Sequence, residues 1–379
     1  MLVKDRIKYH QVKPVSRFFH RFLMFLFYFT TRIGKKIKYV YHFDKKRYRH
    51  RQVMIVSDHA SKMLCKIVYA GCSFAPVNVV VSTLRITTRR SIFNSAMRSG
   101  AILVNQGNLS IRPMYEMSKV IAEGGNILIM PEGRFSYSGS NLPVKKAFAG
   151  FIKKSRVDVV ICKSFGSYLK DPYFANTKRE GPHEYHYSIL FKAEELAQLT
   201  EEEIYAKLMS SFRYNDFMYN KTARNKYFSK TGLAEGIENI LYSCPNCGSE
   251  FTIKGEKNDI VCKKCGTRVS LNEYYDLLSK DERFPYKNID EWYQHQCNDV
   301  NNFVDEKTTI SYMAKLEEYD IEKLSFDAYF ITGEGKVTID YSGIKYVGTR
   351  NNQPFTLFVP IDKVVTFYAD KENNKQYVG

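Results

Sequence analysis

Four cysteines in two closely spaced pairs constrain the fold of this chain more than any other feature. The first pair is Cys244 and Cys247, the second is Cys262 and Cys265, and 14 residues lie between the pairs. A two-residue gap lets one tight turn present both sulfur atoms, and four thiolates complete the tetrahedral shell of a zinc ion. A glycine follows each pair and permits the left-handed backbone that such turns favour. The sequence therefore predicts a four-cysteine zinc ribbon.

The predicted Zn²⁺ is expected to be structural, because protein fills all four positions and leaves none open for water activation. Its binding should contribute on the order of 10 kcal/mol to folding a module too small to have its own core. Disulfides or free thiols are the alternative interpretation. The remaining cysteines lack any framework spacing, which is typical of a reducing compartment: Cys65, Cys72, Cys162 and Cys297.

The charge of the chain is concentrated at its beginning. The net charge is +17, and residues 1–51 hold 15 Lys or Arg against Asp5 and Asp44, or +13 in that segment. A local basic segment indicates a polyanionic partner, either an anionic phospholipid surface or nucleic acid. With 379 residues and 44% hydrophobic content, the chain is long enough for one sizeable core and one or two smaller modules.

A helix is predicted from Pro14, with Ser16 as its cap. The apolar run Phe22 to Phe29 is too short to span a bilayer, which takes roughly 20 residues. Phenylalanines bounded by cations suit a helix lying in the headgroup layer, so residues 1–50 are predicted to dock on the cytoplasmic face of a membrane as a peripheral segment. The alternative is a helix that caps the core. The predicted apolar face holds Phe18, Phe19, Phe22, Phe25, Leu26 and Phe29.

Residues 51–235 are predicted to form one α/β domain, a sheet with flanking helices. Short β-branched runs alternate there with segments of helical periodicity, such as Arg112 to Glu123 and Val144 to Lys154. The predicted strands are Gln52 to Val56, Val77 to Val81, Ile102 to Asn105, Asn126 to Met130, Val157 to Cys162 and Tyr185 to Phe191.

Three further segments follow the α/β domain. The zinc ribbon is placed at residues 240–272 and a helical connector with the only tryptophan, Trp292, at 273–304. Residues 305–379 are predicted to form a small antiparallel β module, because alternating apolar residues are separated by turn signals. These signals are Gly333-Glu334-Gly335, Ser342-Gly343 and Asn351-Asn352.

Polar residues follow two of the predicted strands. His59 comes shortly after the strand Gln52 to Val56, where it is a candidate general base. The strand Asn126 to Met130 runs into Pro131-Glu132-Gly133-Arg134-Phe135-Ser136, a polar turn able to meet a phosphate. Each signal alone is more often structural than functional.

Together and in this order, the blocks resemble the glycerolipid acyltransferase family typified by lysophosphatidic acid acyltransferases, also called 1-acyl-sn-glycerol-3-phosphate acyltransferases. The resemblance covers roughly residues 20–200. Gly100 to Gln106 is similar to the second block of that family, and Val157 to Cys162 matches the fourth block in hydrophobicity alone. The resemblance assigns catalysis to His59 and Glu132, and substrate binding to Ser61, Gly133, Arg134 and Ser136.

The chain departs from the family pattern at charged positions. Asp58 replaces the family Asn, Leu64 occupies the position of the catalytic Asp, and the arginine of the third block stands one place earlier, at Arg134. Neutral amides at Asn105 and Gln106 replace the charged pair of the second block. Leu64 cannot orient the histidine, whereas Glu132 could approach it through space.

The resemblance implies a reaction in phospholipid biosynthesis. The histidine takes a proton from the hydroxyl of a lysophospholipid, such as 1-acylglycerol-3-phosphate, and that oxygen attacks an acyl thioester of coenzyme A or acyl carrier protein. A weakened relative that only binds lipid is the alternative. A third interpretation, a nucleic-acid-binding protein with a basic arm at Lys35 to Arg51, is disfavoured because the ribbon's own cations are mostly offset by acidic residues.

Overall fold

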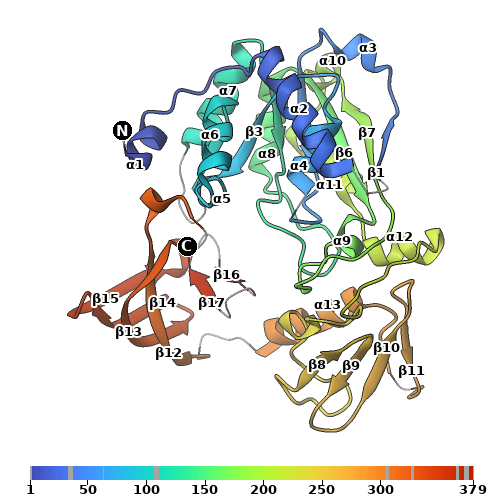
Figure 1. Cartoon of the computed structure of the whole chain (residues 1–379), viewed down its shortest axis with the longest axis vertical. Helices are drawn as coiled ribbons and strands as arrows, with labels where there is room; N and C mark the ends of the chain where they lie inside the picture. Colours follow the sequence, from blue (N-terminus) through green and yellow to red (C-terminus); the bar gives the residue numbers. More distant parts are fainter. Residues whose placement is uncertain are drawn as a thin grey trace. The chain divides into compact units, whose positions relative to one another are not determined.

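The structure is a computed structural model that describes residues 2–32, 37–62, 64–105, 111–282, 284–303, 307–325, 328–363, 367–370 and 375–378 (Figure 1). Two compact units make up the chain. The first, here the site unit, comprises Pro14–Asn78 and Ser118–Cys297. The second, here the β unit, comprises Met1–Lys13, Val79–Met117 and Asn298–Gly379.

A largely parallel sheet forms the centre of the site unit. Its strands follow the order β1-β7-β6-β2-β5, and every neighbouring pair is parallel except β6 and β7. All five residues of β2 are buried, as expected for a central strand with helices on both faces. The α/β prediction is confirmed. The bounds are β1 (Ile37–Tyr41), β2 (Val53–Ser57), β5 (Asn126–Ile129), β6 (Asp158–Phe165) and β7 (His183–Phe191).

The sequence analysis missed β1. This strand lies inside the basic segment, where its short length and its one lysine, Lys38, conceal the β pattern. It pairs in parallel with β7, from Ile37 opposite His183 to Tyr41 opposite Tyr187. Part of the segment predicted to dock on a membrane is therefore a strand of the central sheet.

Helices flank the sheet of the site unit (Figure 1). The predicted cap of α2 is confirmed, because the Ser16 hydroxyl accepts a hydrogen bond from Phe19 N at 3.2 Å. Helix α2 packs on α4, and α8 packs on α11. The bounds are α2 (Arg17–Arg32), α3 (Lys45–Tyr48), α4 (Leu64–Gly71), α8 (Ala147–Ser155), α9 (Ser167–Lys170), α10 (Ala193–Leu196), α11 (Glu201–Phe212) and α12 (Asp216–Ala223).

The cysteine-bearing module shares its core with the rest of the site unit. One buried cluster includes Ala60, next to His59, together with Tyr168, Cys244, Cys262 and Trp292. The module therefore does not fold around a core of its own. Its antiparallel sheet has the order β11-β10-β9-β8, with β8 (Ile253–Glu256), β9 (Asp259–Cys262), β10 (Arg268–Leu271) and β11 (Leu277–Ser279); the 3-10 turn η1 (Ile237–Asn239) precedes it and α13 (Ile289–Phe303) follows it.

The β unit contains a four-stranded antiparallel sheet in the order β12-β13-β14-β15. Val337, Ile344 and Tyr346 are buried on one of its faces. The strands are β12 (Ile310–Tyr319), β13 (Tyr329–Asp340), β14 (Gly343–Arg350) and β15 (Gln353–Pro360), with the separate pair β16 (Phe367–Asp370) and β17 (Lys375–Val378). The same unit includes α1 (Val3–Lys8), α5 (Thr83–Ile86), α6 (Arg90–Arg98), the first part of α7 (Arg112–Ala122), the 3-10 turns η2 (Ile321–Lys323) and η3 (Ile361–Lys363), and the parallel pairing of β3 (Val77–Ser82) with β4 (Ile102–Val104).

Two of the three turn signals in the β unit are confirmed. Asn351 and Asn352 have positive φ between β14 and β15, and Ser342-Gly343 follows the end of β13. The Gly333-Glu334-Gly335 prediction is wrong, because these residues lie inside β13. A Cβ atom at Gly333 would stand 1.7 Å from Thr349 O, so glycine permits close approach of two strands there.

Candidate active site and zinc centre

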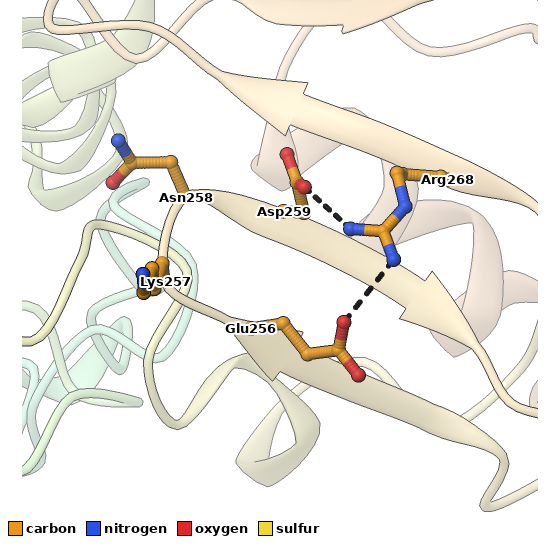
Figure 2. Close-up of a pocket in the computed structure, with 5 residues that line it drawn as sticks. All are labelled: Glu256, Lys257, Asn258, Asp259 and Arg268. Atoms are coloured by element: carbon orange, nitrogen blue, oxygen red, sulfur yellow. Dashed lines mark hydrogen bonds and ion pairs between the residues drawn. The ribbon is translucent and has the colours of Figure 1, made fainter.

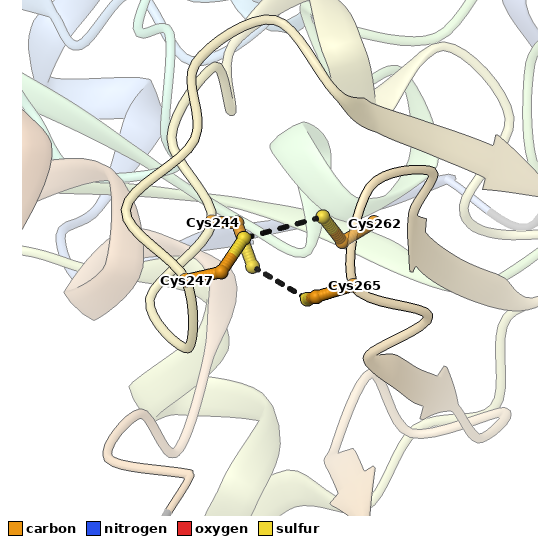
Figure 3. A group of neighbouring side chains, drawn as sticks. All are labelled: Cys244, Cys247, Cys262 and Cys265. Carbon is orange, nitrogen blue, oxygen red and sulfur yellow. Dashed lines mark hydrogen bonds between the residues drawn. The ribbon is translucent and has the colours of Figure 1, made fainter.

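The four cysteines of the predicted zinc shell lie together (Figure 3). Their sulfur atoms are all within 4.8 Å of one another, with Cys244 and Cys265 separated by 3.7 Å and Cys247 and Cys262 by 3.8 Å. A regular tetrahedron with metal–sulfur bonds of 2.3 Å has sulfur–sulfur edges of about 3.8 Å. The donor set and its spacing therefore fit a structural Zn²⁺.

The two cysteine turns have the same backbone geometry. Gly248 N donates to Cys244 O at 2.9 Å, and Gly266 N donates to Cys262 O at 3.0 Å. Both glycines adopt positive φ, at 64° and 75°. Burial opposes ionisation of Cys262, but hydrogen bonds from the Thr252 hydroxyl and nearby backbone N–H groups outweigh it and lower the pKa of the thiol to about 5. The Cys262 sulfur is therefore a thiolate at neutral pH, which is the form that binds a metal ion.

A surface hollow of about 440 Å³ lies on the same module (Figure 2). The Arg268 guanidinium forms ion pairs with Glu256 at 3.2 Å and Asp259 at 2.5 Å. Lys257 and Asn258 complete the lining from the turn between β8 and β9. Glu256 and Asp259 are therefore both paired with Arg268, a residue of the same antiparallel sheet.

The loops after β2 and β5 meet at one edge of the central sheet. These strands are parallel neighbours, with Val56 opposite Ile129, so their carboxyl ends lie side by side. Ligand sites of open α/β sheets form at such edges. Ser136 N donates to His59 O at 3.0 Å, and His59 N donates to Glu132 Oε1 at 3.1 Å. The two polar blocks of the sequence are therefore joined in space.

The His59 imidazole is half-buried and packs edge-on against Phe135, with ring centres 4.3 Å apart. Burial lowers its pKa to about 4, so the ring is neutral at physiological pH. Its Nδ1 atom is buried, and no side chain in the described parts of the chain hydrogen-bonds it. A neutral imidazole has a nitrogen free to take a proton, but a pKa of about 4 makes this histidine a weaker base than an ordinary imidazole.

No carboxylate orients the imidazole in the part of the chain that the structure describes. Asp58 points to the neighbouring strand β6, where its oxygens accept from Ser164 N at 2.7 Å and the Ser164 hydroxyl at 2.8 Å. Leu64 is fully buried at the start of α4. Glu132 reaches the peptide N–H of His59, and its second oxygen accepts from Leu142 N at 2.7 Å. Glu132 thus ties together two loops, and burial raises its pKa to about 8.

The residues predicted to bind substrate fall into two groups. Ser61 and Ser136 are buried, and both hydroxyls have protein partners: Ser61 Oγ lies 3.1 Å from Ser167 Oγ, and Ser136 Oγ accepts from Gly139 N at 2.9 Å. Gly133, with φ 73°, and Arg134 are exposed, and the guanidinium lies 5.7 Å from the Tyr137 ring centre. Gln106, which stands where the second block of the acyltransferase family has an arginine, lies outside the described residues.

A family of zinc ribbons, described as DNA directed RNA polymerase, 7 kDa subunit, matches residues 237–273. This segment contains all four cysteines. It is a zinc ribbon. Among solved structures, the chain is similar to the 1-acyl-sn-glycerophosphate (LPA) acyltransferase PlsC from Thermotoga maritima, with 17% identity, a TM-score of 0.39, and coverage of 52% of this chain and 80% of that chain. The curated proteins give no match.

Helix α2 has two different faces. His20 anchors the buried face on α4, because its ring nitrogens lie 2.8 Å from the Tyr69 hydroxyl and 3.1 Å from Cys72 O. No helix among the described residues has the length and apolar character needed to cross a bilayer. Lys35 and Lys36, part of the predicted basic flank, lie outside the described residues. The opposite face is exposed and holds Phe18, Phe22, Phe25, Leu26 and Phe29.

Sequence reasoning missed the residues that anchor the loop after β5. Asp290 of α13 accepts from the Ser140 hydroxyl at 2.5 Å and from Asn215 Nδ2 at 2.6 Å. These residues stand far apart in the sequence, and no motif joins them. One signal in the sequence pointed to part of this anchor: Asn215 is a residue type that favours helix N-caps. Its side chain does cap α12, because its oxygen accepts a hydrogen bond from Phe217 N.

Proposed function

We propose that this chain is a membrane-surface acyltransferase, which transfers a fatty acyl group from a thioester donor to a lysophospholipid such as 1-acylglycerol-3-phosphate. The observation that carries the proposal is the joining of His59 to the loop 131–136 at the carboxyl edge of the sheet. These are the two blocks in which the sequence resembles glycerolipid acyltransferases.

His59 supplies the base in the proposed reaction. Its neutral imidazole takes the proton of the acceptor hydroxyl while that oxygen attacks the thioester carbonyl. The carbon–sulfur bond then breaks, and the imidazolium returns the proton to the leaving thiolate of coenzyme A or acyl carrier protein. The products are a diacyl phospholipid and a free thiol, and no acyl-enzyme forms.

The surroundings of His59 predict slow turnover. In the serine protease triad, loss of the carboxylate that orients the histidine costs roughly 10⁴ in rate. Leu64 stands where the resemblance expects that carboxylate, and Asp58 and Glu132 are bound elsewhere. The proposed enzyme therefore works with an imidazole held by packing against Phe135.

Arg134 and α2 support the proposed substrate and location. Arg134 is an exposed residue of the polar turn, and the N–H donors of its guanidinium suit the phosphate of a lysophospholipid. The phenylalanine face of α2 belongs to the same unit as His59, and Arg17 and Arg21 on that helix are exposed. Aromatic side chains with adjacent cations favour docking on an anionic membrane over binding of nucleic acid.

The test is an acceptor screen. Purified protein is incubated with several lysophospholipids and with acyl-CoA or acyl carrier protein thioesters, and thiol release and diacyl product are both measured. Wild type should form product and His59→Ala should not, whereas His50→Ala, an exposed histidine outside the site, should behave as wild type. Equal product from wild type and His59→Ala would refute the assignment.

A second candidate function follows from Leu64 and from the Nδ1 atom of His59, which has no hydrogen-bond partner among the described residues. A site without an orienting carboxylate also suits a relative that binds lysolipid and does not turn it over. In the same screen, this protein would bind the acceptor on liposomes and release no thiol. Comparing liposome co-flotation with a salt-titrated RNA or DNA shift separates both candidates from a nucleic-acid-binding protein.

A further inference from the structure

Helix α13 contacts the zinc ribbon on one side. Trp292 Nε1 donates to Ser243 O at 3.0 Å, and the Gln296 carbonyl accepts from Tyr242 N and Ser243 N at 2.9 and 2.8 Å. Trp292 and Gln296 are one helical turn apart, and both are buried. Ser243 directly precedes Cys244, so this side of α13 holds the backbone that enters the first cysteine turn.

The same helix contacts the loop after β5 on another side. Asp290 accepts from Ser140 and Asn215 through one oxygen, and Gln294 Nε2 donates to its other oxygen at 3.1 Å. Asp290 and Gln294 are again one turn apart, and Asp290 is buried. Tyr293 lies on this side too, where burial raises its pKa and the nearby charge of Arg134 opposes the rise.

The loop 131–142 is therefore fixed at both ends by different parts of the unit. Near its start, Glu132 binds the peptide N–H of His59, and near its end, Ser140 binds Asp290. Between these points stand Gly133 and Arg134, which are exposed. One anchor at the far end of the loop therefore belongs to α13, the helix that follows the zinc ribbon in the sequence, and others come from residues 214–216 at the start of α12.

We propose that α13 couples the zinc ribbon to the loop that carries Arg134, with Asp290 as the positioning residue. A ribbon folded by its metal fixes Ser243 and hence α13, and α13 fixes Ser140. Loss of the metal frees the first cysteine turn, loosens α13 and removes the Asp290 anchor from the loop 131–142, whereas the bonds that Tyr168, Asn215 and Asp216 make to the loop remain. The consequence for acyl transfer rests on the function proposed above, but the coupling itself is a property of the folded chain.

The experiment is hydrogen exchange with mass spectrometry on the full chain, with zinc content measured in parallel. Asp290→Ala should keep one zinc ion per chain and leave peptides 244–265 protected. Peptides from 131–142 should exchange faster on the order of tenfold, because the Ser140 hydroxyl loses its charged acceptor and the loop opens more often. Asp290→Asn keeps an acceptor oxygen and should restore part of the protection. Asn298→Ala, an exposed position on the same helix, is the matched control.

Zinc removal by a chelator gives the second arm. Peptides 131–142 should lose protection together with 244–265, regain it when zinc is returned, and do so while peptides from β2 stay protected. Faster exchange of 244–265 with an unchanged loop would overturn the coupling. If the chelated protein also loses protection in β2, zinc removal has unfolded the whole site unit and the Asp290→Ala variant becomes the deciding test. Unchanged exchange of peptides 131–142 in that variant overturns the proposal.

Activity adds a readout that separates this coupling from the proposed function. Asp290→Ala should raise KM for a phosphate-bearing acceptor more than it lowers kcat, because Arg134 is displaced while His59 stays in place. If wild type transfers no acyl group, the proposed function fails and the exchange experiment still tests the coupling. If wild type is active and Asp290→Ala has wild-type exchange and wild-type KM, the coupling fails alone.

Discussion

Replacing Glu132 with glutamine should change how the stability of the site unit depends on pH. Burial raises the folded-state pKa of Glu132 to about 8, above its ordinary value of 4.5. A carboxyl with a raised pKa contributes stability that is fully present below pH 4.5 and is lost as pH rises through 8. The loss approaches about 1.4 kcal/mol per pH unit inside that window. Glutamine does not ionise and has no such dependence.

The substitution also has an effect that does not depend on pH. Both carboxyl oxygens accept backbone N–H bonds, from His59 and Leu142, whereas a glutamine amide has only one oxygen. One buried N–H would therefore lose its acceptor, at a cost of about 1–3 kcal/mol. Below pH 4.5 the wild type should be the more stable protein by this amount. Because the pH-dependent loss sums to about 4 kcal/mol by pH 8, the difference should shrink as pH rises and reverse in favour of the glutamine variant before pH 8.

Urea unfolding followed by the fluorescence of Trp292 gives the free energy of unfolding of both proteins, since this is the only tryptophan and it lies in the site unit. The measurement runs from pH 5 to 8.5 with zinc in excess. Glu123→Gln, which removes an exposed carboxyl just after α7, is the control and should give a constant difference. A wild-type advantage that stays constant or widens toward pH 8 would refute the assignment of a buried, neutral Glu132.

Three further predictions concern metal, membrane and phosphate. Cys262→Ser should bind less than one zinc ion per chain and leave the ribbon unfolded, because structural zinc contributes on the order of 10 kcal/mol; metal analysis and hydrogen exchange measure both effects, and full zinc content would contradict the ribbon. Phe18→Ser with Phe25→Ser should cut co-flotation with anionic liposomes by roughly tenfold or more per side chain without lowering Tm, since both rings are exposed; unchanged flotation would exclude α2 as the docking face. Arg134→Ala should raise KM for a phosphate-bearing acceptor by roughly tenfold or more, with a smaller effect in Arg134→Lys; an unchanged KM would place the phosphate elsewhere.

The central strands were predictable because burial on both faces leaves continuous apolar runs, such as Val53 to Val56. Strand β1 was not, because its lysine and its place in a basic segment favour a surface segment, and its partner β7 lies far along the chain. The Gly333 signal failed for a different reason. Glycine serves turns and close strand contacts alike, and one sequence does not distinguish them.

The candidate site was predictable to the level of the loops. Neighbouring parallel strands bring His59 and Glu132 to one edge, as the alternation of the sequence indicated. The atoms that meet were not predictable: Glu132 was expected near the imidazole, and it binds the peptide N–H of His59. Side-chain direction at a strand end depends on loop backbone geometry, which no residue pattern in this chain specifies. The catalytic and substrate-binding assignments remain predictions.

The bond between Ser140 and Asp290 joins residues 150 positions apart. During synthesis at about 5–20 residues per second, the loop after β5 would wait roughly 8–30 s for its Asp290 anchor. Throughout that interval the Ser140 hydroxyl lacks its Asp290 partner, and the loop has only the anchors made by residues up to 216. If α13 couples the zinc ribbon to this loop as proposed, chains made without zinc should be cleaved between residues 131 and 142 more readily than chains made with zinc.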